Sequence, residues 1–286
     1  MNILLIGVII AVLVFFLAVM IVDSNRFVTR RYEIKTDKIK TDKRYVFVSD
    51  LHGKAYGSKD NKRLLDAIGK LEPDAVLVGG DILTAYPGND FYVASNFVKG
   101  LSEKYKLIYA EGNHEFRARI FPDVYKSMHT DYIREIGDAG VKICVNEAVE
   151  DGDVMVYCLS IDYPYYKRFK QFPMDDSYLN SVMGEADKDK FCVLLAHNPD
   201  YFEQYAKWGA DLTLSGHVHG GVVRIPFWRG VVSPMCTFFP KYDGGMFEKY
   251  GNKMIVSRGL GMHTIPFRMF NPAEIVVIDL KCDVKA

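Results

Sequence analysis

The sequence predicts an α/β domain that is preceded by one transmembrane helix. Short apolar runs at 45–49, 75–79 and 107–110 alternate with segments whose apolar residues recur at helical spacing. This alternation is typical of βαβ units with parallel strands. Each run ends in a cluster of Asp, Asn, His and Gly residues. Residues 3–22 form a continuous apolar stretch, long enough to cross about 30 Å of hydrocarbon as a helix.

The apolar stretch 3–22 has the features of an uncleaved anchor. A cleavable signal peptide would show a basic residue before the run, a shorter apolar core and a small-x-small exit. The chain instead begins with Met1-Asn2 and leaves the run at Asp23-Ser24. We therefore expect a transmembrane anchor at 1–22, in preference to a signal peptide or a buried core helix.

Basic residues follow the anchor and do not precede it. The segment 23–44, predicted as a basic juxtamembrane linker, contains Arg26, Arg30, Arg31, Lys35, Lys38, Lys40, Lys43 and Arg44. Because positive charge stays on the cytoplasmic side, we predict a single-pass protein of the cell membrane whose domain faces the cytoplasm. A solvated linker without a membrane role is the alternative for these residues, and it is compatible with the same topology.

The predicted domain, 45–286, begins with successive βαβ units and ends in strands and loops. Its expected elements are strand 45–49, helix 58–71, strand 75–79, a helix that begins after 87–90, strand 107–110, helix 121–137, and strands at 191–196, 212–215, 254–257 and 274–278. Between 141 and 161 the apolar runs are shorter and more alternating, as in antiparallel pairing. The carboxyl ends of successive parallel strands meet at one sheet edge, where ligands bind in such folds.

Composition restricts the classes of partner. The 36 basic and 36 acidic side chains give a formal net charge of zero, which argues against a nucleic-acid partner and against a nuclease. The five cysteines are odd in number and contain no CxxC spacing, so neither a disulfide framework nor a cysteine metal site is expected. Free cysteines agree with a reducing compartment.

Five strand ends carry side chains suited to metal binding. Asp50 and His52 are two residues apart, so in extended backbone they project to the same side. The remaining members are Asp81, Asn113, His114, His197, His217 and His219. Clustered His and Asp residues indicate a metal or catalytic site. Oxygen and imidazole ligands without thiolate suit Mn, Fe, Zn or Co and do not select among them.

In these residues the sequence resembles the calcineurin-like metallophosphoesterase superfamily, whose motifs are Asp-x-His, Gly-Asp, Gly-Asn-His-Glu/Asp, His and Gly-His-x-His. All five motifs are present in order between Asp50 and His219. Residues 239–242 and 257–261 also resemble a membrane-anchored bacterial branch that includes UDP-diacylglucosamine pyrophosphatase-like phosphodiesterases. The resemblance implies that 45–286 is a metallophosphoesterase domain, a four-layer αββα sandwich of two mixed sheets.

The resemblance further implies a dinuclear centre with two divalent transition-metal ions. It assigns Asp50, His52 and His219 to one ion, Asn113, His197 and His217 to the other, and Asp81 to both as a bridge. Two such ions hold a phosphate through its oxygens and acidify a bound water, and the resulting metal-bound hydroxide attacks phosphorus in line. The expected partner is therefore a phosphoester substrate.

Four further residues receive roles from the resemblance or from their chemistry. His114 resembles the histidine that assists the leaving group, and Glu115 is expected to orient its other ring nitrogen. Arg258 is a candidate phosphate clamp, because guanidinium binds oxyanions bidentately; a structural salt bridge is the alternative. His263 is a candidate for lining the same substrate pocket.

The segment 163–173 interleaves Tyr and Phe with Lys and Arg. Such a texture suits a lipid headgroup interface or stacking on a nucleotide base, and a solvated loop that packs through its aromatics is the alternative. Apolar residues in 225–228 follow the last metal motif, and those in 265–267 follow the segment 257–261. An anchored domain with such loops is suited to a substrate that is partly embedded in the membrane.

These observations predict a membrane-anchored phosphoesterase that hydrolyses a phosphodiester or pyrophosphate bond, in a lipid- or nucleotide-linked substrate. The alternative enzyme acts on a soluble substrate such as a cyclic nucleotide or a phosphoprotein. The alternative from another class is a noncatalytic metal-binding scaffold. Such scaffolds typically lose ligands, and none of the expected ligands is missing here.

Overall fold

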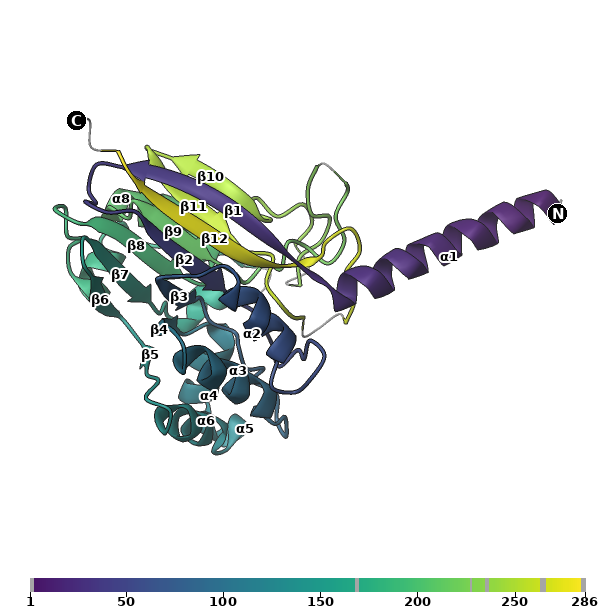
Figure 1. The fold of residues 1–286 in the computed structure, drawn as a ribbon, viewed down its shortest axis with the longest axis horizontal. Coiled ribbons are helices and arrows are strands. Elements are labelled where there is room, and N and C mark those ends of the chain that lie inside the picture. Colours follow the sequence, from purple (N-terminus) through teal and green to yellow (C-terminus); the bar gives the residue numbers. More distant parts are fainter. Residues whose placement is uncertain (1–2, 168–169, 227, 235–236, 263–265, 284–286) are drawn as a thin grey trace.

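The computed structural model describes residues 3–167, 170–226, 228–234, 237–262 and 266–283. A long N-terminal helix projects from a domain of two sheets with helices on their outer faces (Figure 1). The helices are α1 (Ile3–Asn25), α2 (Lys62–Gly69), α3 (Tyr92–Ser102), α4 (Asn113–Ile120), α5 (Pro122–Tyr125), α6 (Met128–Gly137), α7 (Tyr178–Met183) and α8 (Phe202–Trp208), with 3-10 turns at Tyr163–Tyr166 and Pro199–Tyr201.

Each sheet has six strands and mixed pairing. The strands are β1 (Phe27–Thr36), β2 (Lys43–Val48), β3 (Ala75–Val78), β4 (Lys106–Ala110), β5 (Ile143–Cys144), β6 (Glu147–Asp151), β7 (Val154–Leu159), β8 (Phe191–Ala196), β9 (Leu212–Ser215), β10 (Gly245–Lys249), β11 (Asn252–Val256) and β12 (Ala273–Cys282). The first sheet has the order β1-β12-β2-β3-β4-β5, and the second has the order β10-β11-β9-β8-β7-β6. Antiparallel pairs occur only at β12–β2, β10–β11 and β6–β7 among the named strands.

The apolar side chains of the strands form three successive packing layers. Val46 and Val76 on one face of the first sheet pack against Leu64 of α2 and Phe97 of α3. The other face of that sheet packs directly on the second sheet, whose β7, β8 and β9 contribute to the same cluster. The outer face of the second sheet is covered by α7 and α8. Helix, sheet, sheet and helix therefore follow one another, and the predicted fold of two mixed sheets flanked by helices is confirmed.

The segment predicted as a linker, 23–44, is largely part of the domain. Helix α1 continues to Asn25, and β1 starts two residues later. Strand β1 pairs in parallel with β12 along its whole length, from Phe27 opposite Ala273 to Thr36 opposite Cys282. The sequence did not predict β1, because its charged residues do not resemble the apolar pattern of a central strand. An edge strand can carry basic side chains at such positions.

Other differences concern the helices. The helix predicted at 121–137 is two helices, α5 and α6, because the backbone of Lys126 between them, with φ of 57° and ψ of −133°, is not helical. Helix α4 was not predicted, and it begins at a metal motif residue, Asn113. In the region 141–161 the predicted antiparallel pairing holds for β6 and β7, whereas β7 pairs with β8 in parallel.

Candidate metal centre

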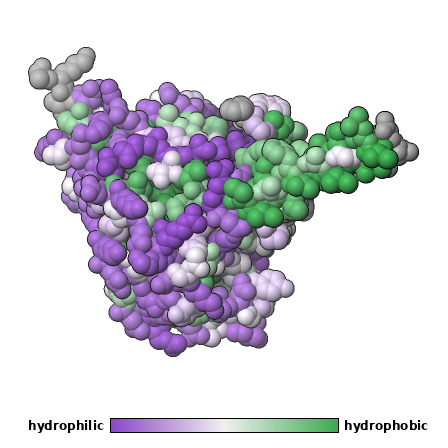
Figure 2. Space-filling model, turned by 45° about the vertical axis from the view of Figure 1, so that its right-hand side comes forward, coloured by the Kyte–Doolittle hydropathy of each residue, from purple (hydrophilic) through white to green (hydrophobic). Residues whose placement is uncertain are grey.

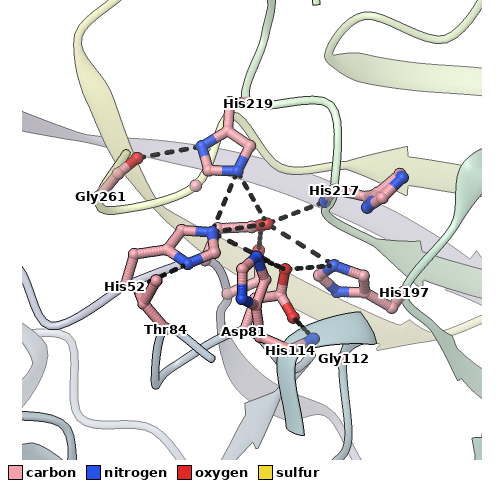
Figure 3. A network of polar contacts seen from close by, with 12 residues as sticks. His52, Asp81, Thr84, Gly112, His114, His197, His217, His219 and Gly261 are labelled. Carbon is pink, nitrogen blue, oxygen red and sulfur yellow. Dashed lines mark hydrogen bonds and ion pairs between the residues drawn. The ribbon is translucent and has the colours of Figure 1, made fainter. Parts of the chain in front are cut away.

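The candidate ligands come from the carboxyl ends of both sheets. Asp50, Asp81 and Asn113 follow β2, β3 and β4 of the first sheet, whereas His197 follows β8 of the second sheet. The fifth motif, with His217 and His219, follows β9. Because the two sheets pack face to face with these ends at the same edge, side chains from both meet (Figure 3).

The backbone at these positions is unusual. Asp50, His52, Asp81, His217 and His219 all have positive φ, between 49° and 70°. Left-handed conformations are costly for residues with a Cβ atom, and they persist where the surrounding structure over-determines them. The same turns direct five candidate ligands inward, so the local strain is concentrated at the site.

Two glycines allow the carboxylates to sit against backbone. A Cβ atom on Gly112 would lie 2.3 Å from Oδ1 of Asp81, and one on Gly216 would lie 2.2 Å from Oδ2 of Asp50. Both distances are far below contact distance, so any larger residue would displace a candidate ligand. The Gly-Asn-His and Gly-His motifs therefore need glycine for close approach.

The ligand atoms form three overlapping groups. The groups are Asp50 with His52 and His219, His52 with Asp81 and His114, and Asp81 with His197 and His217, each with its ligand atoms within 4.8 Å of one another. Oδ1 of Asp50 lies 3.3 Å from Nε2 of His219, and Oδ2 of Asp81 lies 3.1 Å from Nε2 of His197 and 3.7 Å from Nε2 of His52. His52 and Asp81 each belong to two of these groups, and Asp81 is the carboxylate of the two.

Hydrogen bonds at the far side of two rings determine their tautomers. Nδ1 of His197 lies 2.7 Å from the carbonyl oxygen of Gly79, and Nδ1 of His219 lies 3.0 Å from that of Gly261. A carbonyl oxygen only accepts, so each Nδ1 carries hydrogen and donates. In the neutral rings Nε2 then presents a lone pair to the carboxylates, the arrangement that metal-binding histidines adopt.

Oδ1 of Asn113 is buried and makes no hydrogen bond with any described residue, whereas Nε2 of His197 faces the carboxylates of Asp81 and Asp50 at 3.1 and 3.8 Å. Burying an amide oxygen without a partner is costly, and a divalent ion accepts both an amide oxygen and an imidazole nitrogen. The residues present therefore fit the divalent metal ions that the sequence motifs imply.

The pKa values of the site residues indicate that the two buried carboxylates are stabilised by positive charge. Burial opposes ionisation of Asp81, but His197 and His114 hold the pKa of this carboxyl well below its usual range. Burial also disfavours a charged His197, yet Asp81 and Asp50 raise the pKa of its ring to about 10. Two carboxylates in a buried site are compensated by protons on histidine, and metal ions would displace those protons.

His114 presents a proton to the site. The backbone N–H of Ala85 donates to Nδ1 of His114 over 3.0 Å, so the neutral ring carries its hydrogen on Nε2. Nε2 lies 4.0 Å from Oδ2 of Asp81, beside the candidate ligands. This tautomer donates a hydrogen bond from Nε2 to a group bound at the centre.

Glu115 does not orient His114, contrary to expectation. Its carboxylate accepts hydrogen bonds from the hydroxyl of Tyr109 and from the backbone N–H groups of Asp81, Ile82, Leu83 and Gly112, at 2.8–3.3 Å. Burial and the nearby Asp81 carboxylate raise the pKa of Glu115 to about 7. Glu115 thus ties the turn after β3 to the start of α4, and the ring of His114 is held by backbone instead.

We predict that Glu115→Gln destabilises the metal-free protein by about 2–3 kcal/mol, because the new amide N–H₂ faces backbone donors and leaves at least one of them unsatisfied. Urea unfolding measures the change. Glu147→Gln is the matched control, because Glu147 is exposed and pairs only with Lys142; it should change stability by about 0–1 kcal/mol. Equal stability of the two variants would refute the anchoring role of Glu115.

Of the two candidate substrate residues, Arg258 lies away from the candidate metal centre. The Arg258 side chain lies beside Glu274, with 3.6 Å between Nε and Oε2, in a cavity at the end of α1. It lines neither of the described cavities that border the metal motifs, so the structure does not bring Arg258 to the candidate metal centre. His263 lies outside the described residues, as do Phe169 and Phe227 of the loops.

Two cavities border the centre. One of about 400 Å³ contains His217 and is lined by Tyr166, Lys167, Lys170 and Lys241. The other, of about 340 Å³, contains His52 and Thr84. The ring of Tyr166 meets that of His217 edge to face, with centroids 5.7 Å apart. The sequence pointed to the aromatic-basic segment 163–173 and, by resemblance, to 239–242, but it did not indicate that Lys167, Lys170 and Lys241 line one cavity.

The comparison with protein-family models decides the family. Residues 43–221 match the model described as calcineurin-like phosphoesterase, and this range includes all seven candidate metal ligands. The chain belongs to this family. The sequence motifs predicted a metal-dependent phosphoester hydrolase. The family match and the clusters of His and Asp residues support this prediction.

Relatives of this calcineurin-like phosphoesterase cover most of the chain. An uncharacterized metallophosphoesterase of Aquifex aeolicus is 28% identical over 88% of this chain and 90% of its own length. The UDP-2,3-diacylglucosamine pyrophosphatase LpxG of Chlamydia muridarum is 21% identical over 82% of each chain. A zebrafish (Danio rerio) protein, named transmembrane protein with metallophosphoesterase domain, is 25% identical over 83% of this chain and 53% of its own.

Proposed function

We propose that this chain is a membrane-anchored dinuclear phosphoesterase that hydrolyses a phosphodiester or pyrophosphate bond in a lipid- or nucleotide-linked substrate. The observation that carries the dinuclear proposal is the pair of ligand groups that meet at Asp81, one with His52 and one with His197 and His217. The buried, unbonded oxygen of Asn113 supplies a further ligand to the second group.

The chain's own residues then have distinct roles. Two bound divalent ions would supply Lewis acidity and a nucleophile at neutral pH. Asp81 holds the two ligand groups together, and the backbone carbonyls of Gly79 and Gly261 keep two histidines in the ligating tautomer. His114 directs its Nε2 hydrogen toward the centre, where the neutral ring can donate a hydrogen bond to the leaving oxygen or to the phosphate.

The substrate proposal rests on the cavity of about 400 Å³ beside His217. Lys167, Lys170 and Lys241 line this cavity, and Asp200 is its one acidic lining residue. Clustered ammonium groups favour phosphate groups, and a diphosphate offers charge beyond the scissile bond. The pyrophosphatase activity in the name of the Chlamydia relative supports the same class.

Substrate preference tests this proposal. Lys241→Gln should lower kcat/KM for a nucleoside-diphosphate-linked lipid by about tenfold, the effect of one lost charged hydrogen bond. A small chromogenic diester needs only the centre, so its kcat/KM should change little. Lys188→Gln is the control, because Lys188 is exposed and lines none of these cavities.

The opposing outcomes are distinct. Equal losses on both substrates would make Lys241 a structural residue. No loss on either, together with faster turnover of a cyclic nucleotide or a phosphopeptide than of the diphosphate, would favour a soluble substrate. No turnover of any phosphoester by metal-loaded protein would favour a noncatalytic scaffold.

The proposed anchor is α1, an apolar helix of 23 residues whose most hydrophobic window is unburied. The basic residues of β1 follow it, and by the positive-inside rule they support a domain that faces the cytoplasm. A reporter enzyme fused after Ala286 should therefore be active only in the cytoplasm, and Ile3–Asn25 should remain on the mature protein. Periplasmic or extracellular reporter activity would overturn this orientation.

A further inference from the structure

A cavity of about 780 Å³ lies where α1 leaves the domain. Phe15, Val19 and Val22 of α1 line one wall, and Ile225 and Phe270 line the wall opposite. The three helix residues are spaced by four and three positions, so they form one stripe along α1. In the space-filling view the hydrophobic surface of α1 extends to this junction, and the domain beyond it is mostly hydrophilic (Figure 2).

Four arginines line the same cavity: Arg26, Arg30, Arg224 and Arg258. Three of them have close carboxylate partners at 2.6–3.1 Å, namely Asp23 for Arg26, Glu274 for Arg30 and Asp243 for Arg224. Asp23 is the one acidic residue among the lining residues. The four guanidinium groups therefore exceed the three carboxylates that pair with them, by one positive charge.

Arg258 carries the unbalanced charge. Its Nε is buried and makes no hydrogen bond with a described residue, and its nearest carboxylate, Glu274 at 3.6 Å, already pairs with Arg30. Burial and the neighbouring Arg224 and Arg30 lower the pKa of Arg258 to about 10, although Glu274 opposes them. A buried guanidinium with an unused donor lacks a counter-anion, and guanidinium groups bind phosphate well.

We propose that this cavity, which we call the interfacial cavity, binds one anionic phospholipid through its phosphate, separately from the metal centre. The phosphate lies among Arg258, Arg26 and Arg224, and an acyl chain follows the stripe of Phe15, Val19 and Val22. The inference rests on the proposed membrane position of α1 and is independent of the proposed catalytic activity.

The apolar wall is the reason for a lipid rather than a soluble anion. Free phosphate would satisfy Arg258 but would leave the stripe on α1 exposed to water. Arg26 and Arg30 follow α1 closely in the chain, and Arg224 and Arg258 line the same cavity at its end, which is the depth of the headgroups when α1 spans the bilayer. Anionic lipids are concentrated in the cytoplasmic leaflet, and the proposed topology puts these arginines on that side of the membrane.

Native mass spectrometry of the full chain, released from nanodiscs, tests the proposal. With phosphatidylglycerol and phosphatidylcholine in equal amounts, wild type should retain one phosphatidylglycerol in preference to phosphatidylcholine. Arg258→Gln and Arg26→Gln should each weaken retention by about tenfold, as expected for one lost charged contact. Arg31→Gln is the matched control, since Arg31 neighbours Arg30 but pairs with Asp279 and is absent from the cavity wall.

Three outcomes would overturn the site. These are equal retention of both lipids by wild type, unchanged retention in both cavity variants, and equal loss in Arg31→Gln. Displacement of the lipid by millimolar inorganic phosphate would show that a free anion is the ligand and would overturn the lipid assignment. Turnover of a chromogenic diester in the same preparations separates this result from failure of the catalytic proposal, and Arg26→Gln keeps the test open if Arg258→Gln does not fold.

Discussion

Asp81→Asn should abolish stable metal binding and reduce turnover by more than the 10–100-fold typical of an outer-shell partner of a metal site. Oδ2 of Asp81 lies within 4.0 Å of Nε2 of His52, His114 and His197. No other described carboxylate belongs to two of the three ligand groups. The amide removes the negative charge that both ligand groups share, so the loss should exceed that of His52→Ala. Metal analysis and diester turnover of the purified variant measure both effects.

Asp66→Asn is the matched control for Asp81→Asn. Asp66 is an exposed residue of α2 that pairs with Lys62, so both metal content and turnover should match wild type. Removal of metal from wild type with a chelator should reproduce the Asp81→Asn phenotype, and added divalent ions should restore only the wild type. A variant that retains two ions per chain and near-normal turnover would refute the bridging role.

His114→Asn should keep the bound metal and lose turnover by about 10²–10³-fold, the usual loss when one hydrogen-bond donor to developing negative charge is removed. The physical reason is the tautomer, because Ala85 donates to Nδ1 and leaves the ring proton on Nε2 beside Asp81. An acidic leaving group develops negative charge more easily and needs this hydrogen bond less. The loss should therefore shrink as the leaving-group pKa falls, and a series of aryl phosphodiesters measures it.

The leaving-group series separates three roles for His114. An equal loss across the series would assign it to phosphate binding or to the fold. Loss of metal would make it a ligand, as its group with His52 and Asp81 permits. His129→Asn is the control, because His129 lies on α6 outside the three ligand groups, and it should leave the slope unchanged.

The positions of the metal motifs could be predicted because each follows a short buried strand. The strands that contain Val46 and Val76 place buried apolar side chains on both faces of the sheet, and polar residues begin where each of these strands ends. Parallel pairing then brings separate motifs to one edge. The family resemblance added the order of the motifs and the second sheet.

The remainder depends on contacts that leave no periodic signal. The backbone carbonyl groups of Gly79 and Gly261 determine the tautomers of His197 and His219. Every residue has a backbone carbonyl group, so the residue type does not reveal this role. Glu115 follows His114 directly, yet it turns toward the amides of the preceding strand end. Strand β1 was missed because it lies at a sheet edge, where water accepts its charged side chains.

Because β1 pairs with β12, the first sheet cannot be completed early during translation. Strand β12 lies between β1 and β2 in the first sheet, but it begins 230 residues after β2 does, at 273 against 43. At about 5–20 residues per second, synthesis of that interval takes roughly 12–46 s. Throughout this time the nascent chain exposes two unpaired strand edges. The first sheet closes only when nearly the whole polypeptide has been translated, so ribosome stalling or premature termination yields an aggregation-prone intermediate.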